Sequence, residues 1–324
     1  MRRYLLAGLL WMLGQSTPGL AGLPLDNPVE GAAKPSPVVV IPFAPPVDKD
    51  LAYAVRIIKS QNGTTKLATF EERLRFTPSE NGYFLTITMV SGAIPGLEII
   101  NMEAAPPAVS PQLKALLAPI SFDVARDGSI VRVRDWEGVK KRYAAIPDIM
   151  VSVQGTDARQ IANNVIRPYL SASAEQAVPL LLKAWPQITG FGGSELEPGV
   201  EYSQNIETSS PLLPITIPTT VRTSLAEDST DRALHIVVDS TPDQTATSKA
   251  IAGFVTGLGT NLPPQQQANV AKAVELMKKM NITDHHDILF DRVTGLVLRA
   301  TLQRTVKIEG MGSGGERVEI DLHE

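Results

Sequence analysis

Alternating apolar and polar residues predict β-strands in two separate stretches of the chain. In the first stretch, strands are expected at residues 51–60, 64–77, 83–90, 120–125 and 129–134. In the second stretch, strands are expected at residues 200–208, 215–225, 234–240, 287–290, 296–308 and 317–322. Asn62-Gly63 and Arg126-Asp127-Gly128 are typical hairpin turns, so neighbouring strands are expected to pair in antiparallel order.

Apolar residues at helical spacing predict helices between these strands. The expected helices cover residues 110–117, 136–145, 157–170, 174–188 and 265–280. The last is the strongest prediction, because a run of good helix formers follows Pro263 and Pro264. In the simpler interpretation the apolar face of this helix, with Met277 and Met280, packs on a sheet. In the alternative it lines a lipid pocket.

The order of these elements predicts an α+β protein with curved antiparallel β-sheet and helices packed on one face of it. Residues 51–135 and 199–308 share the order strand, strand, strand, helix, strand, strand, which suggests a duplicated βββαββ unit as a hypothesis. The pattern is compatible with two arrangements, one in which the two halves share a single sheet and one in which each half forms its own sheet. The expected organisation is a signal peptide at 1–21, a proline-rich extended leader at 22–50, an N-terminal β-rich half at 51–150, a central helical connector at 151–196 and a C-terminal β-rich half with a long helix at 197–324.

The first 22 residues have the form of a secretory signal peptide. Arg2 and Arg3 precede an apolar run at residues 4–13, and small residues lead to an expected cleavage after Ala21. The run is shorter than the roughly 20 residues that a membrane-spanning helix needs. We therefore expect export to the periplasm, with the extracellular medium as the alternative, and no transmembrane segment in the mature chain.

Composition narrows the range of functions. The formal net charge is −4 and no basic run occurs, which argues against nucleic-acid binding. The chain has no cysteine, which excludes disulfides, thiol nucleophiles and cysteine-ligated metals. Aromatic residues make up 5% of the chain, which is few for sugar stacking and favours an aliphatic ligand. No cofactor is expected.

One cluster has the residue types of a metal site, Asp284-His285-His286-Asp287. Adjacent side chains in a strand point to opposite faces, so only alternate members can share a metal ion. The remaining histidines, His235 and His323, are distant in the sequence. A polar loop before the strand at 287–290 is the simpler interpretation, and no metal is expected.

The sequence evidence for catalytic residues is equally weak. Ser194 follows Gly192-Gly193 but lacks the flanking pattern and the preceding strand of a nucleophile elbow, and Ser248 is directly followed by Lys249 rather than spaced from it. The carboxylates at the two Gly-containing hairpins suggest paired acids for glycoside cleavage, but turn formation explains two of them, Asp127 and Asp291, more simply. These four carboxylates are Asp123, Asp127, Asp287 and Asp291. The glycine-rich residues 310–315 lack the lysine of a phosphate loop and are expected to form a hairpin tip.

An exported, cysteine-free chain with this order of hairpins and covering helices resembles the LolA/LppX-type periplasmic lipoprotein carriers. It is also similar to exported β-rich families whose hairpins carry an Asp-x-x-Thr-Gly turn, here residues 291–295. The resemblance lies in the architecture of residues 50–310 and implies a half-barrel whose apolar interior holds an acyl chain. The leading hypothesis is a non-catalytic periplasmic protein that binds or carries a lipophilic ligand. The alternatives are an envelope protein that acts through protein contacts and, third, an unrecognised hydrolase.

Overall fold

The computed structural model describes residues 37–61, 63–94, 97–99, 115, 118–148, 158–182, 184–209, 216–259, 279–309 and 312–323. Most of them lie in one antiparallel sheet of twelve strands. Eleven strands follow one path: β7 (Ile130–Val133), β6 (Ile120–Ala125), β4 (Gly82–Ile94), β3 (Thr64–Ser79), β2 (Asp50–Gln61), β14 (Gly312–His323), β13 (Val297–Ile308), β12 (Met280–Asp291), β11 (Ala233–Pro242), β10 (Thr216–Leu225) and β9 (Glu201–Ser209). The twelfth, β5 (Leu97–Ile99), pairs with β4. A separate two-stranded sheet joins β1 (Val39–Val40) to β8 (Glu195–Leu196).

The two predicted β-rich halves share this single sheet. Each half is a run of strands in which neighbours in sequence pair with each other, except that β6 pairs with β4 and not with β5. The halves meet where β2, at the start of the first, pairs with β14, at the end of the second. The chain therefore enters the sheet at its centre and returns to the centre with its last strand.

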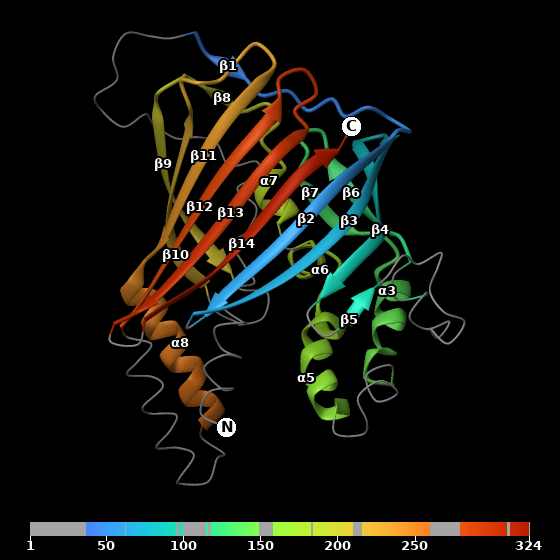
Figure 1. Cartoon of the computed structure of the whole chain (residues 1–324), viewed down its shortest axis with the longest axis vertical. Coiled ribbons are helices and arrows are strands. Elements are labelled where there is room, and N and C mark those ends of the chain that lie inside the picture. Colours follow the sequence, from blue (N-terminus) through green and yellow to red (C-terminus); the bar gives the residue numbers. More distant parts are fainter. Residues whose placement is uncertain are drawn as a thin grey trace.

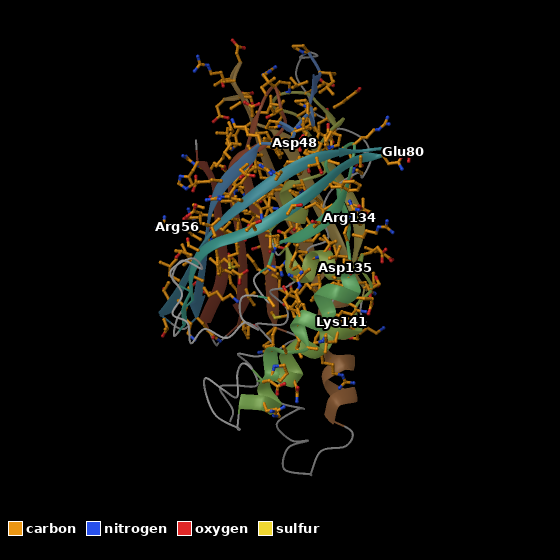
Figure 2. All side chains as sticks on the ribbon, turned by 90° about the vertical axis from the view of Figure 1, so that its right-hand side faces the viewer. Asp48, Arg56, Glu80, Arg134, Asp135 and Lys141 are labelled. Atoms are coloured by element: carbon orange, nitrogen blue, oxygen red, sulfur yellow. The ribbon has the colours of Figure 1, made fainter. Side chains whose placement is uncertain are left out.

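Strict alternation gives the sheet one buried face, called here the inner face. The opposite face, called the outer face, carries exposed charged residues such as Arg56 of β2, which is labelled in Figure 2. In β12, buried and exposed or half-buried residues alternate over all twelve positions from Met280 to Asp291, because successive side chains in a strand point to opposite sides. The main core holds inner-face residues from strands at both ends of the sheet, such as Phe122 of β6 and Tyr202 of β9. The sheet accordingly curves around α6 and α7, which lie behind the central strands in Figure 1.

The expected α+β class with helices packed on one face is wrong, because the described protein is mostly β. Its helices are α3 (Trp136–Tyr143), α5 (Ala158–Ser171), α6 (Ala177–Leu181), α7 (Trp185–Ile188) and α8 (Gln244–Gly259). The helix expected at 174–188 is two short helices, and Pro186 stands in the first turn of the second, where its missing N–H costs no hydrogen bond. The helices expected at 136–145 and 157–170 are confirmed as α3 and α5.

Three further predictions lie wholly or mostly outside the described residues. They are the signal peptide, the helix at 110–117 and the long helix at 265–280. The structure also contains α8, a helix that the sequence pattern did not predict. Its threonines and glycines have low helix propensity, and its apolar residues form no clear stripe.

Residues 37–47, called here the strap, close one end of the curved sheet. The strap pairs with β8 through β1 in antiparallel register. Its Phe43 ring packs edge-on against Phe76 at 5.9 Å and Tyr83 at 5.6 Å. Gly295 touches the strap so closely that a Cβ atom there would lie 1.7 Å from the carbonyl oxygen of Pro42. The last part of the proline-rich stretch is thus packed against the core.

Candidate ligand-binding face

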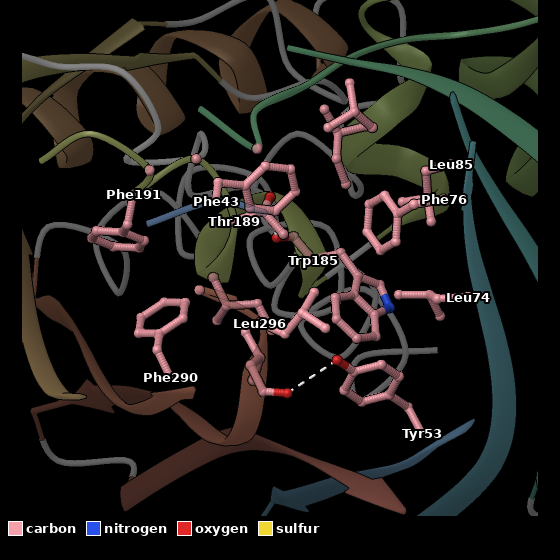
Figure 3. A pocket seen from close by; sticks show the side chains of 18 residues that line it. Phe43, Tyr53, Leu74, Phe76, Leu85, Trp185, Thr189, Phe191, Phe290 and Leu296 are labelled. Atoms are coloured by element: carbon pink, nitrogen blue, oxygen red, sulfur yellow. Dashed lines mark hydrogen bonds between the residues drawn. The ribbon is translucent and has the colours of Figure 1, made fainter. Parts of the chain in front are cut away.

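The inner face next to the strap packs against α7 and the residues after it. Between them lies a small cavity of about 20 Å³, which is room for about one water molecule. Tyr53, Trp185, Phe290 and Leu296 are among its lining residues (Figure 3). The rings of Tyr53 and Trp185 meet edge to face with centroids 4.9 Å apart. Side chains fill this part of the interior, so an acyl chain does not fit there.

Two polar side chains, Tyr53 and Glu72, face each other across β2 and β3 beside this packed region. The Tyr53 hydroxyl donates a hydrogen bond to the carbonyl oxygen of Val297 at 3.0 Å. The indole Nε1 of Trp185 donates to Oε2 of Glu72 at 2.9 Å. Burial raises the pKa of Glu72, and the hydrogen bond from Trp185 offsets only part of that effect. Glu72 therefore lies at the end of the packed region, and its carboxyl group ionises less readily than that of an exposed glutamate.

Past Glu72 the inner face continues as an apolar strip formed by Ile57, Ala68 and Phe70. Ile57 lies directly opposite Ala68 in the pairing of β2 with β3. All three residues are half-buried. The Phe70 ring lies over Gly92 of β4, where a Cβ atom would come within 2.7 Å of it. The apolar strip is thus a part of the apolar face that the core leaves partly open.

A row of charged side chains crosses the inner face beyond the apolar strip. Each member lies directly opposite the next in the strand register: Asp284 on β12, Arg304 on β13, Glu316 on β14, Lys59 on β2 and Lys66 on β3. Arg304 binds Asp284 through two hydrogen bonds, from Nε to Oδ1 at 2.6 Å and from Nη2 to Oδ2 at 2.7 Å. The ammonium of Lys59 lies 3.1 Å from the carboxylate of Glu316. These five residues are called the charged row.

The charged row runs from the buried interior to solvent. The exposed fraction of the side chain is 2% for Asp284 and 13% for Arg304, then 15% for Glu316 and 32% for Lys59. Lys66, at the end of the row, is exposed. The inner face therefore opens to water on the side of β2 and β3, where the apolar strip also lies.

The charged row also divides the buried apolar residues of the second half. On its far side a smaller group is buried apart from the main core: Met280, Ile282, Val306 and Ile308. Polar side chains at Asp284 and His286 thus interrupt an otherwise apolar inner face of β12. The expected loop over residues 284–287 is wrong, because these residues continue the strand.

Alternation in β12 separates the four residues that had the types of a metal site. Asp284 and His286 are buried on the inner face, and His285 and Asp287 are exposed on the outer face. Nδ1 of His285 lies 2.8 Å from the carboxylate of Asp239 on β11. Within the part of the chain that the structure describes, no group of three or more His, Asp or Glu side chains is placed to hold a metal ion.

His235 also lies on the outer face, between two carboxylates. Its Nδ1 is 2.8 Å from Asp228 and its Nε2 is 3.2 Å from Asp287. Partial burial lowers the pKa of His235, but the contacts with the two carboxylates outweigh this and raise it overall. His235 is thus part of an ion-pair cluster with Asp228 and Asp287, in which Nδ1 is hydrogen-bonded to Asp228 and Nε2 is buried beside Asp287 without a well-aligned hydrogen bond to any described residue.

His286 is the most deeply buried histidine of the described chain, at 3% exposure. Its Nδ1 is buried without a hydrogen-bond partner among the described residues. Burial lowers the pKa of His286 to about 4, and the charge of Asp284 offsets only part of that effect. The imidazole is therefore neutral at pH 7.

The other candidate catalytic residues have structural roles or separate locations. Asp127 accepts a hydrogen bond from the backbone N–H of Ser129 at 2.9 Å, and Asp291 accepts one from the N–H of Thr294 at 2.7 Å, so both stabilise turns as expected. Asp123 pairs with Arg132 on the neighbouring strand. The two serines are far apart in the fold, since Ser194 adjoins β8, whereas Ser248 lies in α8.

Sequence reasoning missed the charged row. The sequence did contain a clue to the charged row. Its charged residues stand at positions where the alternation of the strand calls for an apolar residue. Arg304 stands between Leu302 and Val306, and Lys59 follows Ile57 by two residues. Charges in such positions point to a buried polar contact, but the partners come from strands that are distant in sequence.

No family model matches the chain, and no curated protein matches it. Among solved structures, the chain is similar to lipovitellin, in a structure described as showing lipid–protein interactions in lipovitellin, with a TM-score of 0.41 and 11% sequence identity. The match covers 85% of this chain and 25% of the lipovitellin chain, so this chain spans about a quarter of that protein's length. Within the described residues, no helix is long and apolar enough to cross a membrane.

Proposed function

We propose that this protein binds a lipophilic ligand on the inner face of its sheet. The observation that carries the proposal is the apolar strip of Ile57, Ala68 and Phe70, which continues the core surface but stays half-buried. Apolar surface left in contact with water costs free energy, at roughly 25 cal/mol per Å². A ligand with an aliphatic chain gains that free energy by covering the strip.

The ligand lies along the strip and not in the cavity beside Trp185. That cavity, at about 20 Å³, is far below the roughly 300 Å³ at which small-molecule pockets begin. The strip, in contrast, adjoins the water-exposed end of the inner face, where Lys66 is exposed. A ligand therefore reaches the strip without unpacking the core.

The proposed protein is a carrier outside the cytoplasm that performs no covalent chemistry. The signal-peptide pattern of residues 1–22 supports export. The two serines belong to different parts of the fold, and the ring of His235 lies between two carboxylates and not beside either serine. The periplasm is the proposed compartment.

Native mass spectrometry of the mature protein from its own envelope tests the proposal. An additional mass of lipid size that is lost on unfolding supports it. The matched variants are Ala68→Glu, on the inner face, and Leu67→Glu, its neighbour on the outer face, which is 47% exposed. Ala68→Glu is expected to remove the bound mass, while Leu67→Glu retains it. A bare wild-type mass that stays bare after incubation with dodecanoate and dodecanol overturns the proposal.

A further inference from the structure

We infer that the ligand is an anionic amphiphile whose carboxylate or phosphate head group is bound by Lys59 and Lys66 while its aliphatic chain lies on the apolar strip. This inference rests on the proposed function and specifies the chemistry of the ligand. Three observations support it. They are the pairing of Lys59 with Lys66 in the strand register, the excess of positive charge in the charged row, and the increase in solvent exposure along the row toward Lys66.

The register places two like charges directly opposite each other. Lys59 on β2 pairs with Lys66 on β3 on the inner face. Like charges in this position repel and are destabilising in a sheet. An anionic group bound between the two ammonium groups converts that repulsion into two charge-assisted hydrogen bonds, which are about twice as strong as neutral ones.

The charge of the row is unbalanced at this end. Asp284 and Glu316 carry two negative charges, and Arg304, Lys59 and Lys66 carry three positive charges, so the row has a net charge of +1. Within the row, Asp284 contacts Arg304 and Glu316 contacts Lys59. No ion pair of Lys66 occurs among the described residues. The excess positive charge is therefore located at the exposed end.

The polarity of the face orients the ligand. Ile57 and Ala68 stand in the pair of positions next to Lys59 and Lys66 on the same side of the sheet. Phe70 is the fourth residue after Lys66, which is about 13 Å along a strand. An extended chain of about twelve carbons, with about eleven bonds of about 1.2 Å rise each, covers that length. Beyond it lies the packed apolar core around Val55 and Leu74, where a charged group would lose its hydration, so the head group belongs at the lysine end.

Binding of dodecanoate and of dodecanol, which share a chain length and differ in charge, tests the inference. Affinities are measured by isothermal titration with delipidated mature protein at fixed ionic strength. The variant is Lys66→Gln. The control is Arg73→Gln, which removes a positive charge from the outer face of the same strand. Circular dichroism melting verifies that both variants are folded.

We expect dodecanoate to bind the wild type about tenfold more tightly than dodecanol, with Lys66→Gln removing most of that preference and Arg73→Gln retaining it. Equal affinity for the two ligands overturns the inference and leaves the proposed function standing. Binding of neither ligand overturns both. Inorganic phosphate alone is the third probe, and its binding with the same dependence on Lys66 shows a free-anion site and overturns the assignment to a lipid.

Discussion

Replacing Arg304 by methionine tests whether the charged row is a buried electrostatic network. Arg304→Met leaves the Asp284 carboxylate, 2% exposed, without the two hydrogen bonds of 2.6 and 2.7 Å that it now accepts. Ser240 remains as a donor at 3.4 Å. Removing one partner of a buried ion pair costs about 3–5 kcal/mol, because it leaves an uncompensated buried charge. For a chain of about 300 residues, at about 2.1 cal/mol/K of unfolding entropy per residue, a loss of about 3 kcal/mol lowers Tm by about 5 °C.

The double variant Asp284→Leu/Arg304→Met gives the sharper result. It removes both charges, so we expect it to be more stable than Arg304→Met alone by about 2 kcal/mol or more. Urea unfolding followed by circular dichroism measures both free energies, with the slope m showing whether two-state behaviour holds. The control is Arg299→Met, which breaks an exposed pair with Asp321 on the outer face of β13 and should cost under about 1 kcal/mol. A loss under about 1 kcal/mol in Arg304→Met, or a double variant less stable than it, would refute the reasoning.

Two further predictions concern the strap and the buried histidine. Gly295→Ala should destabilise the fold by about 2 kcal/mol more than Gly193→Ala, since both residues have positive φ but an added Cβ atom would collide with the strap only at Gly295. Equal losses in urea unfolding would show that the strap shifts at little cost. The pKa of His286 is lowered to about 4 by burial, so its contribution to stability is present above pH 6.5 and is lost as pH falls from 6.5 toward 4, by up to about 3 kcal/mol. His286→Leu should therefore show a weaker loss of stability over that range, and an unchanged pH dependence would contradict the assignment.

The strands could be predicted from sequence wherever the inner-face positions are apolar. Residues 51–60 and 296–308 have apolar residues at most inner-face positions, with Lys59 and Arg304 as exceptions, and β2 and β13 follow these boundaries closely. The strand at 287–290 was predicted too short, because Asp284 and His286 stand at buried positions and make residues 284–287 resemble a polar loop. The same residues that disrupt the pattern belong to the charged region of the inner face.

The candidate site could not be predicted, because its members meet only through pairing between distant strands. Lys59 and Glu316 are near opposite ends of the chain, and their contact exists because β2 pairs with β14. Local pattern determines which face a residue occupies, but register between distant strands determines its neighbours. The helix α8 was missed for a different reason, since packing against β10 and β12 supports a segment of low intrinsic propensity.

The pairing of β2 with β14 has a consequence for how the protein is made. During synthesis, β2 emerges with a partner on one side only, and its other edge stays unpaired until residues 312–323 have been made. The incomplete sheet then exposes two long edges, on β2 and β13, of the kind that recruit other chains. A chain that lacks residues 312–323 keeps both edges open and is a substrate for aggregation and proteolysis. Completion of the sheet thus depends on β14, and the two edges need protection from other chains until that strand has been made.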